Sequence, residues 1–197
     1  NSINMLDTSI LQQVTEIFLN LEADYTFRIS YAPQREESSQ LIEFLNDFAS
    51  TSAHLSVEKH EAEGDALAFD LLKNGEETGI TFRGIPNGHE FTSLLLAVLN
   101  ADGKGKNLPD EGIAGRIRSL SGDIRLQTYV SLTCTNCPDV VQTLNIFALL
   151  NPGIRHEMVD GALFQSEVDA KGVQAVPSVF ADGKLIHVGR GSLGELL

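Results

Sequence analysis

Residues 124–150 read IRLQTYVSLTCTNCPDVVQTLNIFALL, and this stretch decides the fold. Alternate positions of its first part are apolar or β-branched, which is typical of a strand. Two cysteines, Cys134 and Cys137, come next, and after Pro138 apolar residues recur at helical spacing. The stretch therefore predicts a strand, a loop with a C-x-x-C pair, and a helix from about Pro138 to Leu150.

The same pattern occurs 99 residues earlier in the chain. Alternation over residues 25–31 matches the strand, and helical spacing over residues 38–49 matches the helix. We therefore interpret the chain as an internal repeat. Where the second copy has Cys134 and Cys137, the first copy has Arg35 and Ser38. A cysteine pair is thus present in one copy alone.

Periodicity and turn residues predict the remaining elements of each copy. The first copy is expected to contain helices over residues 6–21 and 89–100, a strand near 55–57, and a hairpin of 66–71 with 79–83 around Asn74-Gly75. The second is expected to contain a strand over 154–159, a helix over 164–170, a hairpin of 178–181 with 185–188, and a final helix from about Ser192. A helix from Pro109 to Leu120 should connect them.

Strand, helix, strand, β-hairpin and helix is the element order of the thioredoxin fold. The predicted class is therefore α/β, with two fused thioredoxin-like folds of which the second alone has a C-x-x-C. The predicted divisions are 5–101 for the inactive fold, 102–122 for a linker and connecting helix, and 123–197 for the active fold. Residues 1–4 are expected to be a cloning remnant.

The charge and hydropathy of the chain exclude some classes of partner. Its net charge of -13 disfavours binding to nucleic acid or to anionic membranes. The most apolar run, residues 91–99, is much shorter than the roughly 20 residues of a membrane span. The N-terminus does not have the pattern of a secretory signal, so we expect a cytoplasmic location.

Two cysteines three residues apart favour redox or metal chemistry over a structural scaffold. A helix N-terminus lowers the pKa of a nearby thiol, so Cys134 is predicted to be the nucleophile. Cys137, one turn into the helix and less exposed, would resolve the mixed disulfide. Two alternatives are a pair of inert buried thiols and a zinc site, for which His156 and His187 would have to join the pair.

Val176-Pro177 directly precedes the predicted strand at Ser178. In a thioredoxin fold a proline here is cis and faces the dithiol, where its loop exposes backbone to an extended partner. We therefore predict that Val176, Pro177 and the two residues inside the pair, Thr135 and Asn136, contact partners. The alternative for Pro177 is an ordinary proline at the start of a strand.

Three segments resemble the N-terminal domain of the flavoprotein component of bacterial alkyl hydroperoxide reductase. They are residues 131–141 (SLTCTNCPDVV), 88–94 (GHEFTSL) and 5–8 (MLDT). In that family two fused thioredoxin folds, the second with a C-x-x-C, precede a module that binds FAD and NADH. We expect no cofactor in this chain and no dinucleotide-binding fingerprint after a strand, which places the flavin module outside these residues.

The resemblance implies an electron relay and a set of partners. Electrons would pass from the flavin module, through its own C-x-x-C, to Cys134 and Cys137, and then to a two-cysteine peroxiredoxin for peroxide detoxification. The full-length protein is expected to be a homodimer and this chain a monomer. No metal, nucleic acid or membrane is implied.

The sequence departs from related patterns at two positions. Thioredoxins carry an acid six residues before the first cysteine, where this chain has Thr128, and the family commonly has His where Thr135 stands. Glu90 matches an acid that the family places near the dithiol, so it is a candidate proton acceptor. The alternative is a solvated glutamate at a helix start, which is common because acids favour helix N-termini.

Two other functions stay open. One is a general protein disulfide oxidoreductase of the glutaredoxin-like type, although such two-fold proteins often carry a C-x-x-C in both halves. The other is a non-enzymatic docking module whose disulfide is structural. A midpoint potential below about -300 mV would be typical of such a structural disulfide.

Overall fold

The computed structural model describes residues 6–105, 108–191 and 196. Contacts divide the chain into two compact units, Asn1–Glu77 and Thr78–Leu197. The predicted remnant at residues 1–4 and the predicted start of the final helix at Ser192 lie outside the described residues.

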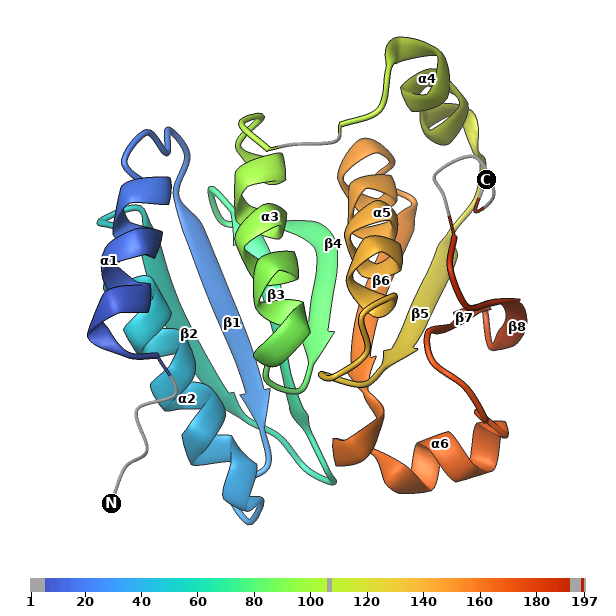
Figure 1. Ribbon diagram of the computed structural model, residues 1–197, viewed down its shortest axis with the longest axis horizontal. Coiled ribbons are helices and arrows are strands. Elements are labelled where there is room, and N and C mark those ends of the chain that lie inside the picture. Colours follow the sequence, from blue (N-terminus) through green and yellow to red (C-terminus); the bar gives the residue numbers. More distant parts are fainter. Residues whose placement is uncertain (1–5, 106–107, 192–195, 197) are drawn as a thin grey trace. The chain divides into compact units, whose positions relative to one another are not determined.

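Strands β2, β1 and β3 lie side by side in the first unit. β1 (Tyr25–Tyr31) pairs in parallel with β2 (Leu55–Glu61) and antiparallel with β3 (Leu67–Lys73). The helices α1 (Thr8–Ile17) and α2 (Glu36–Ala49) lie on one face of these strands (Figure 1). After α1, the first copy thus has the predicted strand-helix-strand arrangement.

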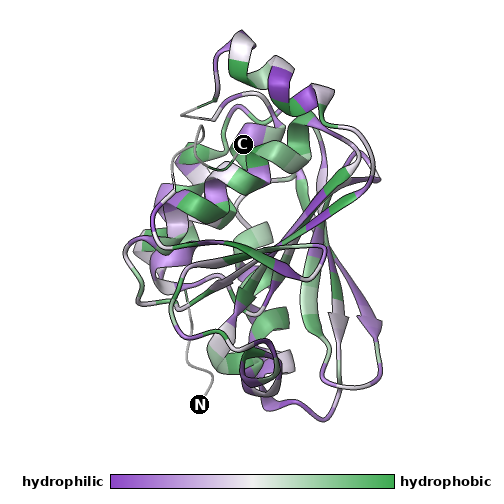
Figure 2. Cartoon of the chain, turned by 90° about the vertical axis from the view of Figure 1, so that its right-hand side faces the viewer, coloured by the Kyte–Doolittle hydropathy of each residue, from purple (hydrophilic) through white to green (hydrophobic). Residues whose placement is uncertain are grey.

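The core of the first unit is rich in phenylalanine. Phe48 of α2 meets Phe18 and Phe27 edge to face, with ring centroids 5.6 Å apart in both pairs. On the opposite side of β1, Arg28 forms ion pairs with Asp70 at 2.8 Å and with Glu77 at 2.7 Å. Figure 2 shows hydrophilic and hydrophobic residues interspersed along the strands. In β1 buried and less buried residues alternate, which explains why period two predicted this strand.

The second unit contains strands in the order β4-β6-β5-β7-β8. β4 (Glu76–Arg83), β6 (Ile154–Asp160) and β5 (Ile124–Val130) are parallel, and β7 (Ser178–Ala181) and β8 (Lys184–Val188) continue as an antiparallel pair. β5 is central, and the C-x-x-C follows its carboxyl end.

Helices cover both faces of β5. Thr128 and its alternate neighbours face α5, whereas Gln127 and Tyr129 face α6, as their side-chain contacts show. α3 packs beside α5 (Figure 1), and Asn151 ties α4 to the end of α5 by donating to the carbonyls of Ile117 and Leu120. The helical elements of this unit are η1 (Gly88–Glu90), α3 (Phe91–Ala101), α4 (Glu111–Ser119), α5 (Cys137–Leu150), η2 (Gly161–Leu163) and α6 (Gln165–Lys171).

The predicted repeat is visible in the strand registers. Tyr25 pairs with Leu55 in the first copy, and Ile124 pairs with Ile154 in the second, at the corresponding positions. Both predicted hairpin turns have positive φ at both residues: 50° and 82° at Asn74-Gly75, and 50° and 83° at Asp182-Gly183. These are the dihedrals that an Asn-Gly or Asp-Gly turn favours.

The compact units divide earlier than the sequence repeat. β4 continues into the second unit and α3 lies wholly within it, although both belong to the first copy in sequence. α3 contacts α5, the helix that begins with Cys137. The predicted domain limits at 5–101, 102–122 and 123–197 stay a prediction about the repeat.

The predicted limits of α1 and α3 are wrong. α1 begins at Thr8 rather than Leu6, because the side chain of Asp7 caps it by accepting from the Ile10 amide at 2.8 Å. It ends at Ile17, and the apolar pattern continues to Leu21 because that side chain is buried outside the helix. α3 begins at Phe91, after the short η1 turn.

Candidate active site

Cys134 and Cys137 form a disulfide at the start of α5, with Cα atoms 5.5 Å apart. Cys137 is the first residue of the helix and is fully buried, whereas Cys134 precedes it and is partly exposed. Pro138 occupies the first turn, where its missing N–H removes no helical hydrogen bond. Solvent and partners can therefore reach Cys134 more readily than Cys137.

The predicted partner loop lies beside the exposed sulfur. The Val176–Pro177 peptide bond is cis, the geometry expected from its position in the sequence. The Val176 carbonyl oxygen is 3.9 Å from Sγ of Cys134, and β7 begins at Ser178. The loop thus presents backbone polar groups next to the disulfide.

The two residues inside the pair differ in their contacts. Thr135 is exposed. Asn136 is half-buried, and its Oδ1 accepts a hydrogen bond of 3.0 Å from Nε of Arg190. The sequence pattern does not single out Arg190, because it follows β8, far from the pair in the chain.

The η1 turn packs against the loop that leads to Cys134. The His89 amide donates to the Leu132 carbonyl at 2.9 Å. Gly88 has a φ of 55°, and a Cβ at this position would lie 2.8 Å from the same carbonyl oxygen. Glycine therefore permits this close approach, which brings Glu90 near the disulfide loop.

Glu90 is a buried carboxyl group with one free oxygen. Ser93 Oγ donates to its Oε1 at 2.6 Å, and Gln142 Nε2 donates to Ser93 Oγ at 3.2 Å. Glu90 Oε2 has no hydrogen-bond partner among the described residues. Burial raises the pKa of Glu90 to about 7, opposed by the Ser93 hydrogen bond and supported by the charges of Asp139 and Asp160. The alternative of a solvated glutamate is wrong.

A second buried polar group links β5, β6 and α5. His156 lies 2.7 Å from Thr128 Oγ1 through Nε2 and 2.7 Å from Asn145 Oδ1 through Nδ1. A carbonyl oxygen only accepts, so Nδ1 carries the hydrogen and the Thr128 hydroxyl donates to Nε2. Burial lowers the pKa of His156 to about 3, which keeps it neutral. Thr128, which stands where thioredoxins carry an acid, is therefore hydrogen-bonded to a neutral imidazole.

The other histidine of the zinc alternative also has partners. His187 Nε2 lies 3.1 Å from the Gly189 carbonyl oxygen and 2.6 Å from that of Arg190. His156 and His187 therefore direct ring nitrogens at protein groups other than the cysteine sulfurs.

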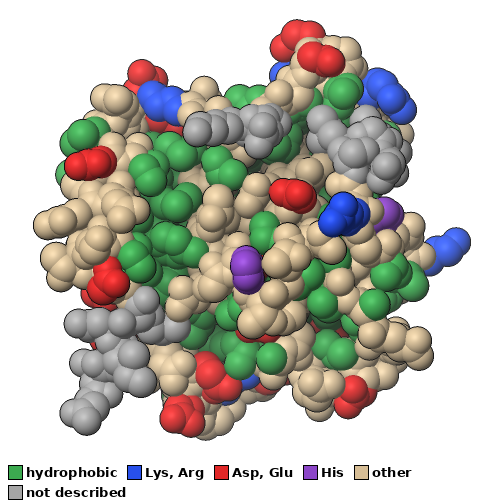
Figure 3. Space-filling view, viewed as in Figure 1, with side chains coloured by type: hydrophobic (Ala, Val, Ile, Leu, Met, Phe, Trp, Pro, Cys, Tyr) green, Lys and Arg blue, Asp and Glu red, His purple; other side chains and the backbone are tan. Residues whose placement is uncertain are grey.

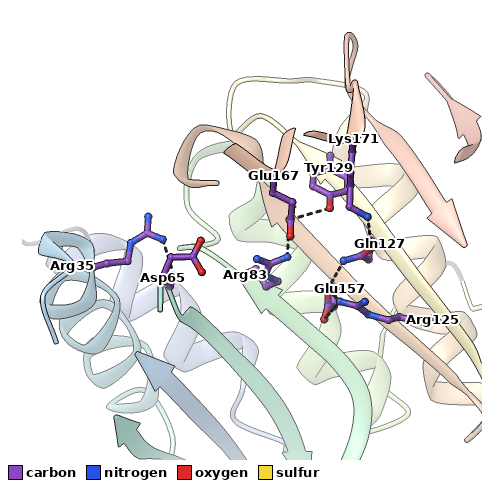
Figure 4. Close-up of polar contacts among 9 residues, drawn as sticks. All are labelled: Arg35, Asp65, Arg83, Arg125, Gln127, Tyr129, Glu157, Glu167 and Lys171. Atoms are coloured by element: carbon purple, nitrogen blue, oxygen red, sulfur yellow. Dashed lines mark hydrogen bonds and ion pairs between the residues drawn. The ribbon is translucent and has the colours of Figure 1, made fainter. Parts of the chain in front are cut away.

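A separate polar network lies on the α6 side of β5 (Figure 4). Glu167 accepts from the Tyr129 hydroxyl at 3.0 Å and pairs with Arg83 at 2.8 Å. Lys171 donates to Gln127 at 3.3 Å. Burial and the Glu167 hydrogen bond raise the pKa of Tyr129, which therefore stays a neutral donor. This network fastens α6 to the strands and does not include the cysteine pair.

The prediction that no dinucleotide-binding fingerprint follows a strand is wrong, because the glycine spacing of such a fingerprint does occur in the sequence. Gly189, Gly191 and Gly194 follow β8 with the spacing G-x-G-x-x-G. Such a motif indicates a nucleotide site when it joins the first strand of a βαβ unit to a helix. β8 is instead paired antiparallel with β7, and Gly194 lies outside the described residues. The spacing alone does not indicate a flavin or nucleotide site.

Two further observations concern the distribution of surface charge and the length of the helices. Acidic and basic side chains are scattered over the face shown in Figure 3 and do not form one charged patch there. Among the described residues, no helix has the length and apolar character needed to span a membrane.

Comparisons with known proteins agree with this geometry. Residues 124–197 match the family model of a thioredoxin domain. The structure is similar to the NTD_N/C domain of alkylhydroperoxide reductase AhpF from Enterococcus faecalis, with 31% identity, a TM-score of 0.87, and 97% of each chain covered. It also has the fold of a protein disulfide oxidoreductase from Aeropyrum pernix, with a TM-score of 0.83, 19% identity, and 95% and 89% of the two chains covered.

Curated relatives match nearly the whole chain. The F subunit of alkyl hydroperoxide reductase in Staphylococcus epidermidis is 40% identical over 98% of this chain and 37% of its own length. A Bacillus subtilis protein named NADH dehydrogenase has the same identity and coverage. The chain thus spans 37% of the length of these relatives.

The fold and the disulfide define a thioredoxin-like α/β protein with a single C-x-x-C, which confirms the predicted fold class. The chain belongs to the family of the N-terminal domain of the alkyl hydroperoxide reductase component AhpF. The resemblance found in residues 131–141, 88–94 and 5–8 is confirmed at the level of the family.

Proposed function

We propose that this chain is a thiol-disulfide exchange domain that carries electrons from a flavin module to a two-cysteine peroxiredoxin. The observation that supports this proposal best is the asymmetric disulfide, with Cys134 partly exposed and Cys137 buried at a helix start. The names of the relatives support the link to peroxide reduction. FAD and NADH would act in the remaining part of the full-length protein.

In the proposed cycle, the Cys134 thiolate attacks one sulfur of the peroxiredoxin disulfide. This forms a mixed disulfide and releases one peroxiredoxin thiolate. The Cys137 thiolate then attacks Cys134 Sγ, which re-forms the Cys134–Cys137 disulfide and releases the second thiolate. Two electrons pass to the peroxiredoxin, and the two released thiolates take up two protons. A dithiol of the flavin module reduces the pair again by the same two exchanges.

Glu90 is the proposed proton acceptor for the resolving thiol. Cys137 is fully buried, so water has little access to its proton. Glu90 lies on the turn that contacts the disulfide loop and has a free oxygen and a pKa of about 7. A carboxyl group with such a pKa exchanges a proton readily near neutral pH.

The Val176–Pro177 loop is the proposed docking point for the partner segment around the reacting cysteine. The Val176 carbonyl already lies near Cys134 Sγ, and Val176 is 37% exposed. An extended segment could pair with this backbone, as in β-strand addition. Thr135 and Asn136 would contact the same segment from the other side.

The test mixes the reduced chain with an oxidised two-cysteine peroxiredoxin and follows the appearance of peroxiredoxin thiols. We expect one peroxiredoxin disulfide reduced per chain, and a trapped mixed disulfide through Cys134 when Cys137 is replaced by Ser. Insulin disulfides provide the comparison substrate. No transfer to the peroxiredoxin would overturn the proposal, and equal rates with insulin would favour a general disulfide oxidoreductase.

A further inference from the structure

Arg190 is a cation that contacts the interior of the C-x-x-C pair. Its Nε donates to Asn136 Oδ1 at 3.0 Å, and Asn136 lies between Thr135 and Cys137. Asn136 is also the N-cap residue of α5, yet its side chain forms no capping hydrogen bond. The amide oxygen is therefore directed to the guanidinium rather than to the helix.

The backbone of Arg190 is held from two sides. Gly189 has a φ of 86° and donates its amide to the Pro177 carbonyl at 2.9 Å. His187 Nε2 lies 2.6 Å from the Arg190 carbonyl oxygen, and because carbonyl oxygens only accept, this nitrogen carries a hydrogen. These contacts join the Pro177 loop, the end of β8 and the cysteine pair.

Three acidic residues lie on segments around the pair. Asp139 belongs to the first turn of α5, Glu90 to η1, and Asp160 ends β6. Asp139 and Asp160 lie close enough to Glu90 to raise its pKa. The chain as a whole carries a net charge of -13. A thiolate formed at Cys134 would therefore add negative charge to an acidic chain, and Arg190 supplies a positive charge through its contact with Asn136.

We propose that Arg190 is a positioning residue that fixes Asn136 and holds a positive charge beside Cys134, so that it stabilises the Cys134 thiolate. Cations beside a cysteine favour its thiolate, and the helix N-terminus of α5 adds to this effect. The inference rests on the proposed function only in that the pair must cycle between disulfide and dithiol. Thiolate stabilisation favours the reduced state, so it also raises the midpoint potential.

The experiment compares Arg190→Gln with wild type in the reduced chain. Thiolate absorbance is titrated with pH, and the disulfide is equilibrated with glutathione. We expect the thiolate-to-thiol ratio of Cys134 at neutral pH to fall about threefold to tenfold, as for a partly solvated charge pair. A tenfold change in the exchange constant corresponds to a midpoint potential about 30 mV more negative. The effect should shrink in 1 M salt, because exposed charges are screened.

Arg118→Gln is the matched control. Arg118 is a half-exposed arginine of α4 that pairs with Glu111 at 3.3 Å. α4 is hydrogen-bonded to the C-terminal end of α5. In a helix of this length, that end lies about 21 Å from Cys137 at the other end. The control removes the same charge at a distance, so it should change neither the thiolate ratio nor the potential. An equal effect of both variants would overturn the proposal.

Asn136→Ala separates the charge of Arg190 from its hydrogen bond. If the hydrogen bond to Asn136 holds the guanidinium in place, Asn136→Ala should lower the thiolate-to-thiol ratio of Cys134. The double variant should then lose less thiolate stabilisation, as a free energy, than the sum of the losses in the two single variants. Additive losses, or an unchanged potential in Arg190→Gln, would overturn the proposal. Glutathione exchange involves no peroxiredoxin, so failed transfer to a peroxiredoxin would refute the proposed function and leave this inference standing.

Discussion

The turns after β1 and after β5 occupy corresponding places in the two copies and are closed by different chemistry. In the first turn, Ser38 is buried and its Oγ donates to the Ala32 carbonyl at 2.7 Å. Arg35 donates to the Asp65 carbonyl at 2.8 Å (Figure 4). In the second turn, the corresponding positions hold Cys134 and Cys137, joined by a disulfide. Hydrogen bonds and a disulfide can therefore close the same kind of turn.

The strands before and after these turns keep the same register in both copies. The difference in chemistry therefore does not come from a different strand arrangement. It comes from the side chains of the turn and from what surrounds it, which in the second unit includes η1, the Pro177 loop and Arg190. Substitutions at matched positions of the two copies test this difference.

The largest effect is expected from the turn residues themselves. Cys134→Ser removes the nucleophile, so electron transfer to a disulfide substrate should fall by about a thousandfold or more. Ser38→Ala, in the first turn, should leave transfer unchanged and cost about 1 kcal/mol of unfolding free energy, because the lost hydrogen bond is buried. Thiol release with a disulfide substrate and urea unfolding measure the two effects.

Loss of transfer in Ser38→Ala at full stability would contradict the assignment of chemistry to the second copy. Residual transfer in Cys134→Ser would mean that Cys137 attacks substrate directly. The first result would remove the functional distinction between the two turns, and the second would remove the assignment of the nucleophile to Cys134.

Substitutions at matched core positions of the two copies are expected to lower the free energy of unfolding by different amounts. Phe48 of α2 and Phe147 of α5 lie at corresponding positions, and both are buried. Replacing either by Ala should cost about 3 to 5 kcal/mol, because each leaves a cavity. Phe48→Ala should lie at the upper end, because it also loses edge-to-face contacts with Phe18 and Phe27. Urea unfolding of both variants checks the order, and a smaller loss for Phe48 would contradict it.

Glu90 makes the second unit sensitive to pH. Its pKa of about 7 in the folded protein lies above its ordinary value of 4.5. Between these values the folded state holds a proton that the unfolded chain releases, so Glu90 lowers stability as pH rises through this window. Glu90→Gln cannot ionise, and its stability relative to wild type should therefore rise by about 2 to 4 kcal/mol between pH 4.5 and pH 8.

Denaturant unfolding at several pH values measures this difference. Glu111→Gln is the control, because Glu111 lies on α4 with a side chain that is 90% exposed. Its stability should follow wild type across the same range. A Glu90→Gln curve parallel to wild type would show that Glu90 titrates as a solvated group.

Much of the fold could be predicted because the strands repeat a clear pattern. β1 and β5 have the predicted bounds, since their alternate apolar or β-branched residues face a core, and in β5 the residues between them are also largely buried. The turns at Asn74-Gly75 and Asp182-Gly183 were also predictable, because few residue pairs adopt positive φ at both positions. The bounds of α1 and α3 were less predictable, because buried apolar residues such as Leu21 continue a helical pattern after the helix has ended.

The cysteine pair could be predicted from its spacing, but its surroundings could not. A glutamate at a helix start usually lies in solvent, and the burial of Glu90 depends on packing that only the folded unit provides. The Arg190–Asn136 contact joins residues 54 positions apart and follows no periodicity. His156 gave a weak signal, as a histidine within a predicted strand, but its partners Thr128 and Asn145 come from other elements.

The smallest effect is expected at the two hairpin turns, where the copies are most alike. Gly75 and Gly183 have φ values of 82° and 83°, and a Cβ at either position would meet no atom within 4 Å. Alanine would therefore cause no clash, and the cost comes only from its left-handed backbone conformation, about 1 kcal/mol in each case. Equal losses for Gly75→Ala and Gly183→Ala in urea unfolding would show that the two turns are energetically equivalent. Because the surroundings of both glycines are open, a difference larger than about 0.5 kcal/mol would mean that one turn depends on contacts elsewhere in its unit. The two copies would then share the backbone geometry of the turn but not its contribution to stability.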